Sequence, residues 1–486
     1  MKYIGTRNKE ITATASEAIL KGICEDGGLF IPDEMPVMDK KLEELVNLDY
    51  RELAYEVMKL FLTDFTEEEL RYCINSAYDE KFDDKDIAPL KVENGVGILE
   101  LFHGRTLAFK DMALSILPYL MKTSAAKNGL DKEIVILTAT SGDTGKAALE
   151  GFANVPGTRI IVFFPEDGVS PVQKLQMVTQ EGDNTCVCGI LGNFDDAQTA
   201  VKTIFTDKEL VKELDEKGFN FSSANSINIG RLVPQIVYYF YAYLAMVRKG
   251  EIRLGEEINF TVPTGNFGNI LAGYIAKKAG LPVKTFICAS NENKVLFDFF
   301  KTGVYDKNRE FVVTTSPSMD ILISSNLERL LCMVSGQEKT KALMESLNKD
   351  GKYTLEVNEN IVGEYATEKE TADAIKSLYE KTGYVMDTHT AVAAKVYKDY
   401  RKDSGDTKKT VIASTASPYK FAKSVMTAID SRYEGTEDFD LIDSMEVVSN
   451  VPIPKVIGEI RDAEILHNLE CDADRMKDTV KTILGV

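Results

Sequence analysis

Short apolar runs alternate with single amphipathic segments through much of this chain from about residue 96 onward. The first strand-like runs are EIVILTAT, RIIVFFP and TCVCGIL, and the helical segments that follow them are GKAALEGFANV, SPVQKLQMVTQ and DDAQTAVKTIFTD. The pattern returns with INFTVPT, GNILAGYIAKKAG and VKTFICAS, after the long apolar helix RLVPQIVYYFYAYLAMV. Apolar strands separated by single helices are typical of βαβ units, whose parallel sheet is buried on both faces. The sequence therefore predicts an α/β fold with two doubly wound domains.

The length of 486 residues supports more than one domain, because a single hydrophobic core rarely organises so long a chain. The first ninety residues mix turn signals such as CEDGGLFIPDEMP with acidic helical stretches. We expect a partly helical N-terminal region at 1–95, a smaller α/β domain at 96–230 and a larger α/β domain at 231–486.

Charge and hydropathy limit the kinds of binding partner that this chain can have. The formal net charge of −19 disfavours nucleic acid and anionic membrane, although it does not exclude a small anion. No apolar run reaches the roughly 18 residues that a membrane helix needs. The N-terminal segment has no apolar core and carries Glu10 and Glu17, which argues against a signal peptide. We therefore expect a cytoplasmic protein that binds no membrane.

Seven cysteines, an odd number and widely scattered, indicate reduced and mostly buried thiols rather than a disulfide framework. Cys186 and Cys188 alternate along an apparent strand, and the further ligands of a metal site are missing. With only three histidines in the chain, we expect no metal.

Two small-residue loops follow predicted strands and open predicted helices: TSGDTG at 140–145 and PTGNFGN at 263–269. Glycines let backbone amides approach an anion, and a helix N-terminus favours negative charge, so both loops are candidate anion cradles. Each is also compatible with a tight strand-to-helix turn. A nucleotide P-loop is excluded at the first loop, because Thr140 and Ala147 stand where that motif needs a glycine and a hydroxyl residue.

Lys110 lies in FHGRTLAFKDMA, at what looks like the start of a helix and directly after an apolar run. Desolvation and the positive helix end would both lower the pKa of its ammonium group. Such a lysine can form a Schiff base with an aldehyde cofactor and then move protons. On the local sequence alone, a surface lysine is the alternative interpretation.

The motifs FHGRTLAFKD, TATSGDTG, PTGNFGN and STASPYKF, in this order, resemble the threonine synthase family, pyridoxal-phosphate enzymes of the tryptophan synthase β-like fold, fold type II. The likeness extends to EDGGLFIP, to NSINIGR at 225–231, to SPSMDILISSNLERL at 316–330 and to DTHTAVAA at 387–394. It therefore covers essentially the whole chain.

The resemblance implies a role for each matching residue of the cofactor site. Lys110 would bond the aldehyde of pyridoxal 5'-phosphate, and Asp143 would approach the pyridine hydroxyl. Thr415, with Ser414 as the alternative, would meet the pyridine nitrogen. The backbone of the second loop would hold the cofactor phosphate through Gly265, Asn266, Phe267, Gly268 and Asn269.

The implied reaction converts O-phospho-L-homoserine and water into L-threonine and phosphate by elimination and replacement, the last step of threonine biosynthesis and a carbon-oxygen lyase reaction. The substrate carboxylate would face Ser141, Gly142, Thr144 and Gly145. Its phosphate would meet a donor among Lys146, Asn225, Ser226 and Arg231. A monomer or homodimer is expected.

Two positions depart from the family pattern. Arg105 replaces a proline found in many relatives, and it is either a further phosphate ligand or a surface substitution. Ser417 replaces a histidine, which leaves open what lines the pyridine-nitrogen side. We expect His103 and His389 to have structural roles.

Other functions remain open at this point. A threonine or serine dehydratase, or a related phospholyase, would use the same chemistry and release an oxoacid and ammonia. A catalytically silent binding protein is disfavoured because Lys110 and both glycine loops are present.

Overall fold

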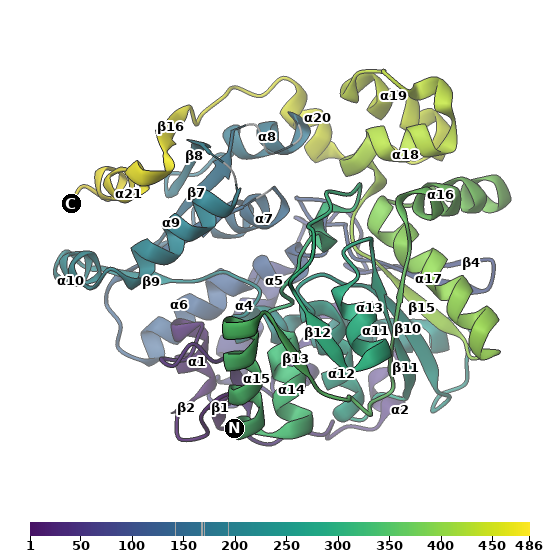
Figure 1. Ribbon diagram of the computed structural model, residues 1–486, viewed down its shortest axis with the longest axis horizontal. Coiled ribbons are helices and arrows are strands. Elements are labelled where there is room, and N and C mark those ends of the chain that lie inside the picture. Colours follow the sequence, from purple (N-terminus) through teal and green to yellow (C-terminus); the bar gives the residue numbers. More distant parts are fainter. Residues whose placement is uncertain (141, 167–168, 170, 193) are drawn as a thin grey trace.

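The computed structural model describes residues 1–486 except 141, 167, 168, 170 and 193. Two parallel sheets organise the chain, as the sequence predicts (Figure 1). The larger sheet has the order β14 (Ile361–Tyr365), β11 (Val283–Ser290), β10 (Ile258–Pro263), β15 (Thr410–Ser414), β5 (Val96–Glu100) and β4 (Leu90–Glu93). Only the edge pair of β4 and β5 is antiparallel among these strands.

The smaller sheet has five strands, all parallel. Their order is β16 (Leu469–Asp472), β8 (Thr185–Leu191), β7 (Thr158–Pro165), β6 (Glu133–Ala139) and β9 (Phe219–Ser222). The described residues also form two small antiparallel sheets: β2 (Thr12–Ala13), β1 (Tyr3–Gly5) and β3 (Phe30–Pro32) in one, and β12 (Val304–Asp306) with β13 (Lys352–Thr354) in the other.

Helices cover both faces of the two parallel sheets. In β11, Phe286 and Cys288 pack in one core cluster with α11 (Ile229–Arg248) and α12 (Gly268–Lys278). The alternate residues Ile287 and Ala289 pack in another cluster with α17 (Thr388–Ser404). In β6, the same alternation separates α7 (Asp143–Phe152) from α9 (Phe194–Thr206). Strands buried on both faces must be apolar at every position, which explains their continuous hydrophobic runs.

The other helices lie around these layers. They are α1 (Ala15–Lys21), α2 (Leu42–Leu45), α3 (Tyr50–Met58), α4 (Glu67–Ala77), α5 (Asp111–Leu114), α6 (Leu117–Lys127), α8 (Pro171–Val178), α10 (Lys208–Glu216), α13 (Val295–Thr302), α14 (Leu327–Ser335), α15 (Gln337–Asp350), α16 (Glu368–Thr382), α18 (Ala422–Ile429), α19 (Asp438–Ser449), α20 (Lys455–Arg461) and α21 (Met476–Leu484). Short 3₁₀ turns include η1 (Pro317–Met319) and η2 (Pro418–Phe421).

Sheet membership does not follow the boundaries expected at residues 96 and 231. Strand β5 pairs with β15 in the larger sheet, although we placed it in the smaller domain. Strand β16, near the C-terminus, pairs with β8 of the smaller sheet, and α21 lies beside α9 (Figure 1). Local periodicity identifies strands, but it does not say which distant strand each one pairs with.

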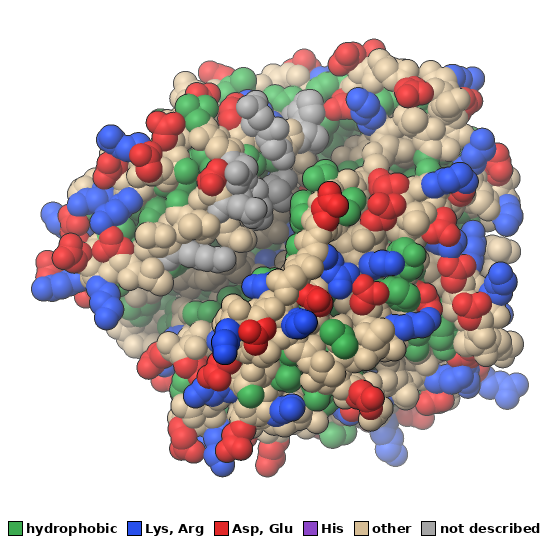
Figure 2. All heavy atoms as spheres, in the orientation of Figure 1, with side chains coloured by type: hydrophobic (Ala, Val, Ile, Leu, Met, Phe, Trp, Pro, Cys, Tyr) green, Lys and Arg blue, Asp and Glu red, His purple; other side chains and the backbone are tan. Residues whose placement is uncertain are grey.

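The surface carries both signs of charge. On the face in Figure 2, Asp and Glu side chains are interspersed with Lys and Arg side chains. Among the described residues, none of the helices is both long enough and apolar enough to cross a membrane.

Candidate active site

Lys110 lies near the carboxyl ends of neighbouring strands in the larger sheet. It immediately precedes the short helix α5, in the segment that follows β5. The neighbouring Phe109 N–H donates to the Thr415 carbonyl at 2.8 Å, and Ala108 bridges to Ala416. Because β5 and β15 are parallel neighbours, their carboxyl ends bring Lys110 close to the Thr415 segment.

The Lys110 side chain is largely shielded from solvent, with 11% of its surface exposed. Its Nζ donates to Ser318 Oγ at 3.1 Å and lies 3.4 Å from Asp143 Oδ2. Burial lowers the pKa of the ammonium group, Asp143 opposes that effect, and the positive charges of Lys420 and Arg231 add to it. The local sequence had left a surface lysine open, and the structure excludes it.

Asp143 begins α7 and is the centre of a buried polar cluster. Its Oδ1 lies 2.8 Å from Lys420 Nζ and accepts from Gln173 Nε2 at 3.1 Å, while its Oδ2 accepts from Ser318 Oγ at 3.1 Å. Burial by itself raises the pKa of this carboxyl, but the charges of Lys420 and Lys110 overcome it and hold the pKa well below its usual range. Asp143 is therefore ionised at neutral pH.

Sequence reasoning missed Lys420, Ser318 and Gln173 as members of this cluster. Lys420 and Ser318 both lay in motifs that carried the family resemblance, STASPYKF and SPSMDILISSNLERL, and that was the available signal. Neither motif indicates which other residue its polar side chain contacts in the folded protein.

The second glycine loop forms a cradle at the start of α12. Phe267 has φ of 64° and precedes the first helical residue, Gly268, so the loop turns sharply into the helix. A Cβ on Gly265 would lie 2.5 Å from the Ser318 carbonyl oxygen, so only glycine fits there. Asn326 N–H donates to the Asn266 carbonyl at 3.0 Å and anchors the loop.

Asn269 leaves an unused donor at this cradle. Its Oδ1 accepts from the hydroxyls of Tyr238 at 2.8 Å and Tyr239 at 2.7 Å. Its buried Nδ2 has no hydrogen-bond partner among the described residues. A buried amide donor beside a helix N-terminus suits a phosphate group, because both supply N–H donors to an anion. The residues present therefore fit the phosphate of pyridoxal phosphate.

Arg231, in the first turn of α11, is a buried cation that pairs with none of the described carboxylates. One of its terminal nitrogens, Nη1, donates to the Ala224 carbonyl at 3.1 Å, and its buried Nε has no described partner. Burial lowers the pKa of the guanidinium to about 10. A buried guanidinium with a free donor is suited to an anionic ligand. Among the other residues expected near the substrate phosphate, Asn225 is exposed and Ser226 half-buried.

The loop expected to face the substrate carboxylate uses two of its amides internally. The N–H groups of Gly142 and Gly145 donate to Thr140 Oγ1 at 3.0 and 2.9 Å, so they are not free donors. The reason is a local cap at the turn into α7, which the residue types alone did not distinguish from an anion cradle. Thr144 is half-buried in the first turn of α7, and Ser141 lies outside the described residues.

Lys146 and Arg105 share a carboxylate instead of facing Lys110. Lys146 is buried, and its Nζ lies 3.2 Å from Glu150 Oε2. Arg105 Nε lies 2.6 Å from Glu150 Oε1, and its Nη2 lies 3.4 Å from Glu459. Both cations line a cavity of about 720 Å³ whose walls do not include Lys110. Their charges are compensated within the protein, which disfavours either as the phosphate ligand.

The other candidate residues of the cofactor site lie just after β15 or at its end. Thr415 and Ser414 are both buried, and Ser414 Oγ hydrogen-bonds to Thr390 Oγ1 at 2.9 Å. Ser417 Oγ accepts from Tyr419 N–H at 3.4 Å and caps the turn η2.

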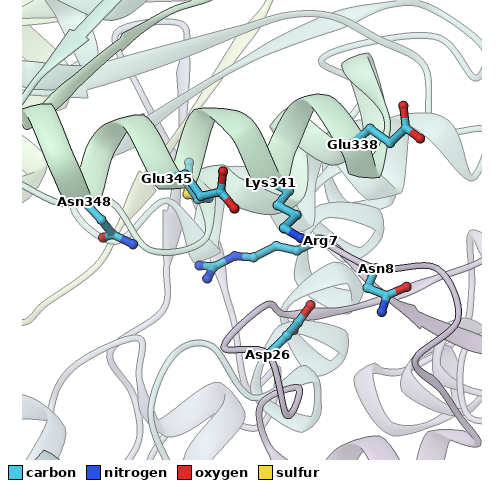
Figure 3. A pocket seen from close by; sticks show the side chains of 8 residues that line it. Arg7, Asn8, Asp26, Glu338, Lys341, Glu345 and Asn348 are labelled. Carbon is cyan, nitrogen blue, oxygen red and sulfur yellow. The ribbon is translucent and has the colours of Figure 1, made fainter.

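A separate cavity of about 530 Å³ lies between the N-terminal segment and α15. Figure 3 shows Arg7 reaching toward that helix. The guanidinium is held by Glu328 through Nε at 2.9 Å and Nη2 at 2.8 Å, so this cation is also compensated.

Comparisons with known proteins match most of the chain to one family. The threonine synthase N-terminus model matches residues 2–78, the pyridoxal-phosphate dependent enzyme model matches 94–416, and the threonine synthase C-terminal model matches 390–458. The threonine synthase of Schizosaccharomyces pombe is 38% identical, with 89% of this chain and 90% of that protein covered. The chain belongs to the threonine synthase family.

Solved structures place the chain in the same family. The yeast threonine synthase superposes with a TM-score of 0.88 at 31% identity, covering 100% of this chain and 99% of that one. A threonine synthase from Brucella melitensis with bound PLP gives 0.87 at 35%, covering 99% of each chain. The human threonine synthase-like 1 protein is 41% identical over 85% of this chain, which spans 58% of that relative. The predicted family and fold type are confirmed.

Proposed function

We propose that this member of the threonine synthase family converts O-phospho-L-homoserine and water into L-threonine and phosphate with pyridoxal phosphate as cofactor, a carbon-oxygen lyase reaction. The observation that carries the proposal is the largely buried Lys110 amine beside Asp143, which Ser318 connects to the cradle at 265–269. In a family of pyridoxal-phosphate enzymes, this arrangement supplies both the amine that bonds the cofactor and the loop that holds its phosphate.

The cofactor and the lysine divide the chemistry. When bound, pyridoxal phosphate supplies an electron-withdrawing ring that takes up the charge left on the α-carbon when its proton is removed. Lys110 Nζ, released from the cofactor when the amino group of the substrate takes its place, would remove that proton and move protons at the β- and γ-carbons. Burial lowers the pKa of this amine, so its neutral form is more available near neutral pH than that of an exposed lysine.

Two charged residues orient the reaction. Ionised Asp143 lies within 3.4 Å of the Lys110 amine and holds it at one end of α7. We assign the substrate phosphate to Arg231, because its buried Nε has no described partner and a guanidinium binds phosphate through two parallel hydrogen bonds. Thr144 is left as the described candidate for the carboxylate, since the amides of Gly142 and Gly145 are used by Thr140.

The test is to incubate the purified, cofactor-loaded protein with O-phospho-L-homoserine and to measure threonine and phosphate together. We expect equal amounts of both products, none with Lys110→Ala, and full activity with Lys423→Ala, which changes an exposed lysine. Release of an oxoacid and ammonia would instead identify a dehydratase or phospholyase, the second candidate, and would overturn the proposal.

The cellular setting is part of the same proposal. All seven cysteines are free thiols, which supports a reducing compartment such as the cytoplasm. The assembly state, monomer or homodimer, stays a prediction that light scattering of the purified protein would test.

A further inference from the structure

We infer that Ser318 is a positioning residue for the Lys110 amine, and this inference rests on the proposed function of that lysine. Ser318 lies in the turn η1, far along the chain from both groups that it contacts. Its Oγ accepts from Lys110 Nζ and donates to Asp143 Oδ2, each at 3.1 Å.

The chemistry of the three groups sets the direction of these bonds. Ionised Asp143 has only acceptor atoms, so it takes the hydroxyl proton of Ser318. The serine oxygen then offers a lone pair to a Lys110 N–H. With one N–H fixed in this way, the neutral amine has a defined orientation for its own lone pair. The hydrogen bond to Ser318 would therefore orient the Lys110 amine as a general base.

The backbone of Ser318 is held from one side by a buried histidine. Ser318 N–H donates to His389 Nε2 at 3.2 Å, and His389 Nδ1 lies 2.8 Å from Asp387 Oδ2. Both His389 and Asp387 are buried. Because Asp387 accepts the proton on Nδ1, Nε2 is left free to accept from Ser318, so the tautomer suits the contact.

Neighbouring bonds hold the same turn from other directions. The Ser318 carbonyl packs against Gly265, where a Cβ would approach it to 2.5 Å. Asn291 Nδ2 donates to Ser316 Oγ at 3.0 Å and to Asp320 Oδ1 at 2.8 Å, on either side of Ser318. Such support keeps a side chain within the narrow range of geometry that catalysis requires. The turn therefore links the cradle at Gly265 to the amine of Lys110.

The experiment compares Ser318→Ala, Ser318→Thr and a control, Ser335→Ala, in the full chain. Ser335 is a half-buried serine whose hydroxyl donates to the Leu331 carbonyl of its own helix. For cofactor-loaded protein we expect Ser318→Ala to lower kcat for threonine formation by about 10- to 100-fold, with KM for O-phospho-L-homoserine within about twofold of the wild type. Ser318→Thr retains the hydroxyl and should restore most of kcat.

A second readout needs no turnover. Before cofactor is added, Lys110 is labelled with an amine-specific reagent at pH 7 and the rate is followed by mass spectrometry. In Ser318→Ala, Asp143 Oδ2 loses its hydroxyl donor and pairs more strongly with the ammonium group, so labelling should slow by about threefold or more.

These readouts separate the outcomes. Unchanged kcat and labelling in Ser318→Ala would overturn the inference, as would a Ser318→Thr variant as impaired as Ser318→Ala. A loss of kcat without slower labelling would assign Ser318 to the substrate and overturn it too. If the wild type forms no threonine, the proposed function fails, while the labelling rates still decide whether Ser318 positions the amine.

Discussion

Lys420 Nζ lies 2.8 Å from Asp143 Oδ1, and this buried ion pair joins the two halves of the site. Lys420 belongs to the segment after β15 of the larger sheet, whereas Asp143 begins α7, which packs on β7 of the smaller sheet. Lys420 Nζ also donates to the Thr106 carbonyl at 2.8 Å, in the segment that leads to Lys110. The pair therefore fixes the N-terminal end of α7 relative to Lys110.

Replacing Lys420 with methionine should destabilise the protein strongly, because Asp143 would keep a buried charge with less compensation. Removing one partner of a buried pair costs about 3–5 kcal/mol, and the Lys110 ammonium offsets part of this. We expect a clearly lower thermal midpoint by scanning calorimetry. The control Lys423→Met changes an exposed lysine nearby and should leave the midpoint unchanged. Equal midpoints for the two variants would contradict this view of the pair.

Replacing Arg231 with glutamine should weaken recognition of the substrate phosphate. We expect kcat/KM for O-phospho-L-homoserine to fall by about 100-fold or more, equivalent to roughly 3 kcal/mol. Inhibition by inorganic phosphate should weaken in parallel. Arg248→Gln, at the exposed end of the same helix, is the matched control. Arg105→Gln should change kcat/KM little, since Arg105 already pairs with Glu150 and Glu459; the reverse ranking of Arg231 and Arg105 would refute our assignment.

Replacing Gly265 with alanine should lower the affinity for pyridoxal phosphate. The added Cβ would approach the Ser318 carbonyl to 2.5 Å, so the cradle or the turn η1 must shift. The measurement is a fluorescence titration of the cofactor-free protein, with an expected rise in Kd of about 10-fold or more. Gly458→Ala, in α20 and with no atom near the added Cβ, should bind the cofactor as the wild type does. Wild-type affinity in Gly265→Ala would show that the loop has room to adapt.

His103 should make stability depend on pH between about 6.5 and 9. Burial lowers the pKa of the ring, but Asp83 and Glu100, at 2.5 and 3.1 Å from its nitrogens, outweigh burial and raise the pKa to about 9. A raised folded-state pKa means that the stabilisation is fully present below the unfolded value of about 6.5. It is then lost as pH rises through about 9.

The measurement is the difference in thermal midpoint between the wild type and His103→Gln across this pH range. We expect the wild-type advantage to shrink as pH rises. A difference that stays constant with pH would mean that the ring does not titrate there.

Much of the fold was readable because local patterns reflect burial. Apolar runs such as EIVILTAT and RIIVFFP form β6 and β7, because a strand that is covered on both faces needs apolar side chains along its whole length. The glycine loops after strands also indicated where α7 and α12 lie, although each helix begins within its loop, at Asp143 and Gly268, and not after it. Both features depend on neighbours within a few residues.

The sequence by itself determined the alternation of strands and helices, the two glycine loops and the segment that carries Lys110. Only the tertiary structure decided that Lys420 and Ser318 meet Asp143, that Lys146 pairs with Glu150 away from Lys110, and that β16 joins the smaller sheet. The physical reason is distance along the chain. Ser318 and Asp143 are 175 residues apart, and no local preference specifies which buried charge meets which partner once the sheets have assembled.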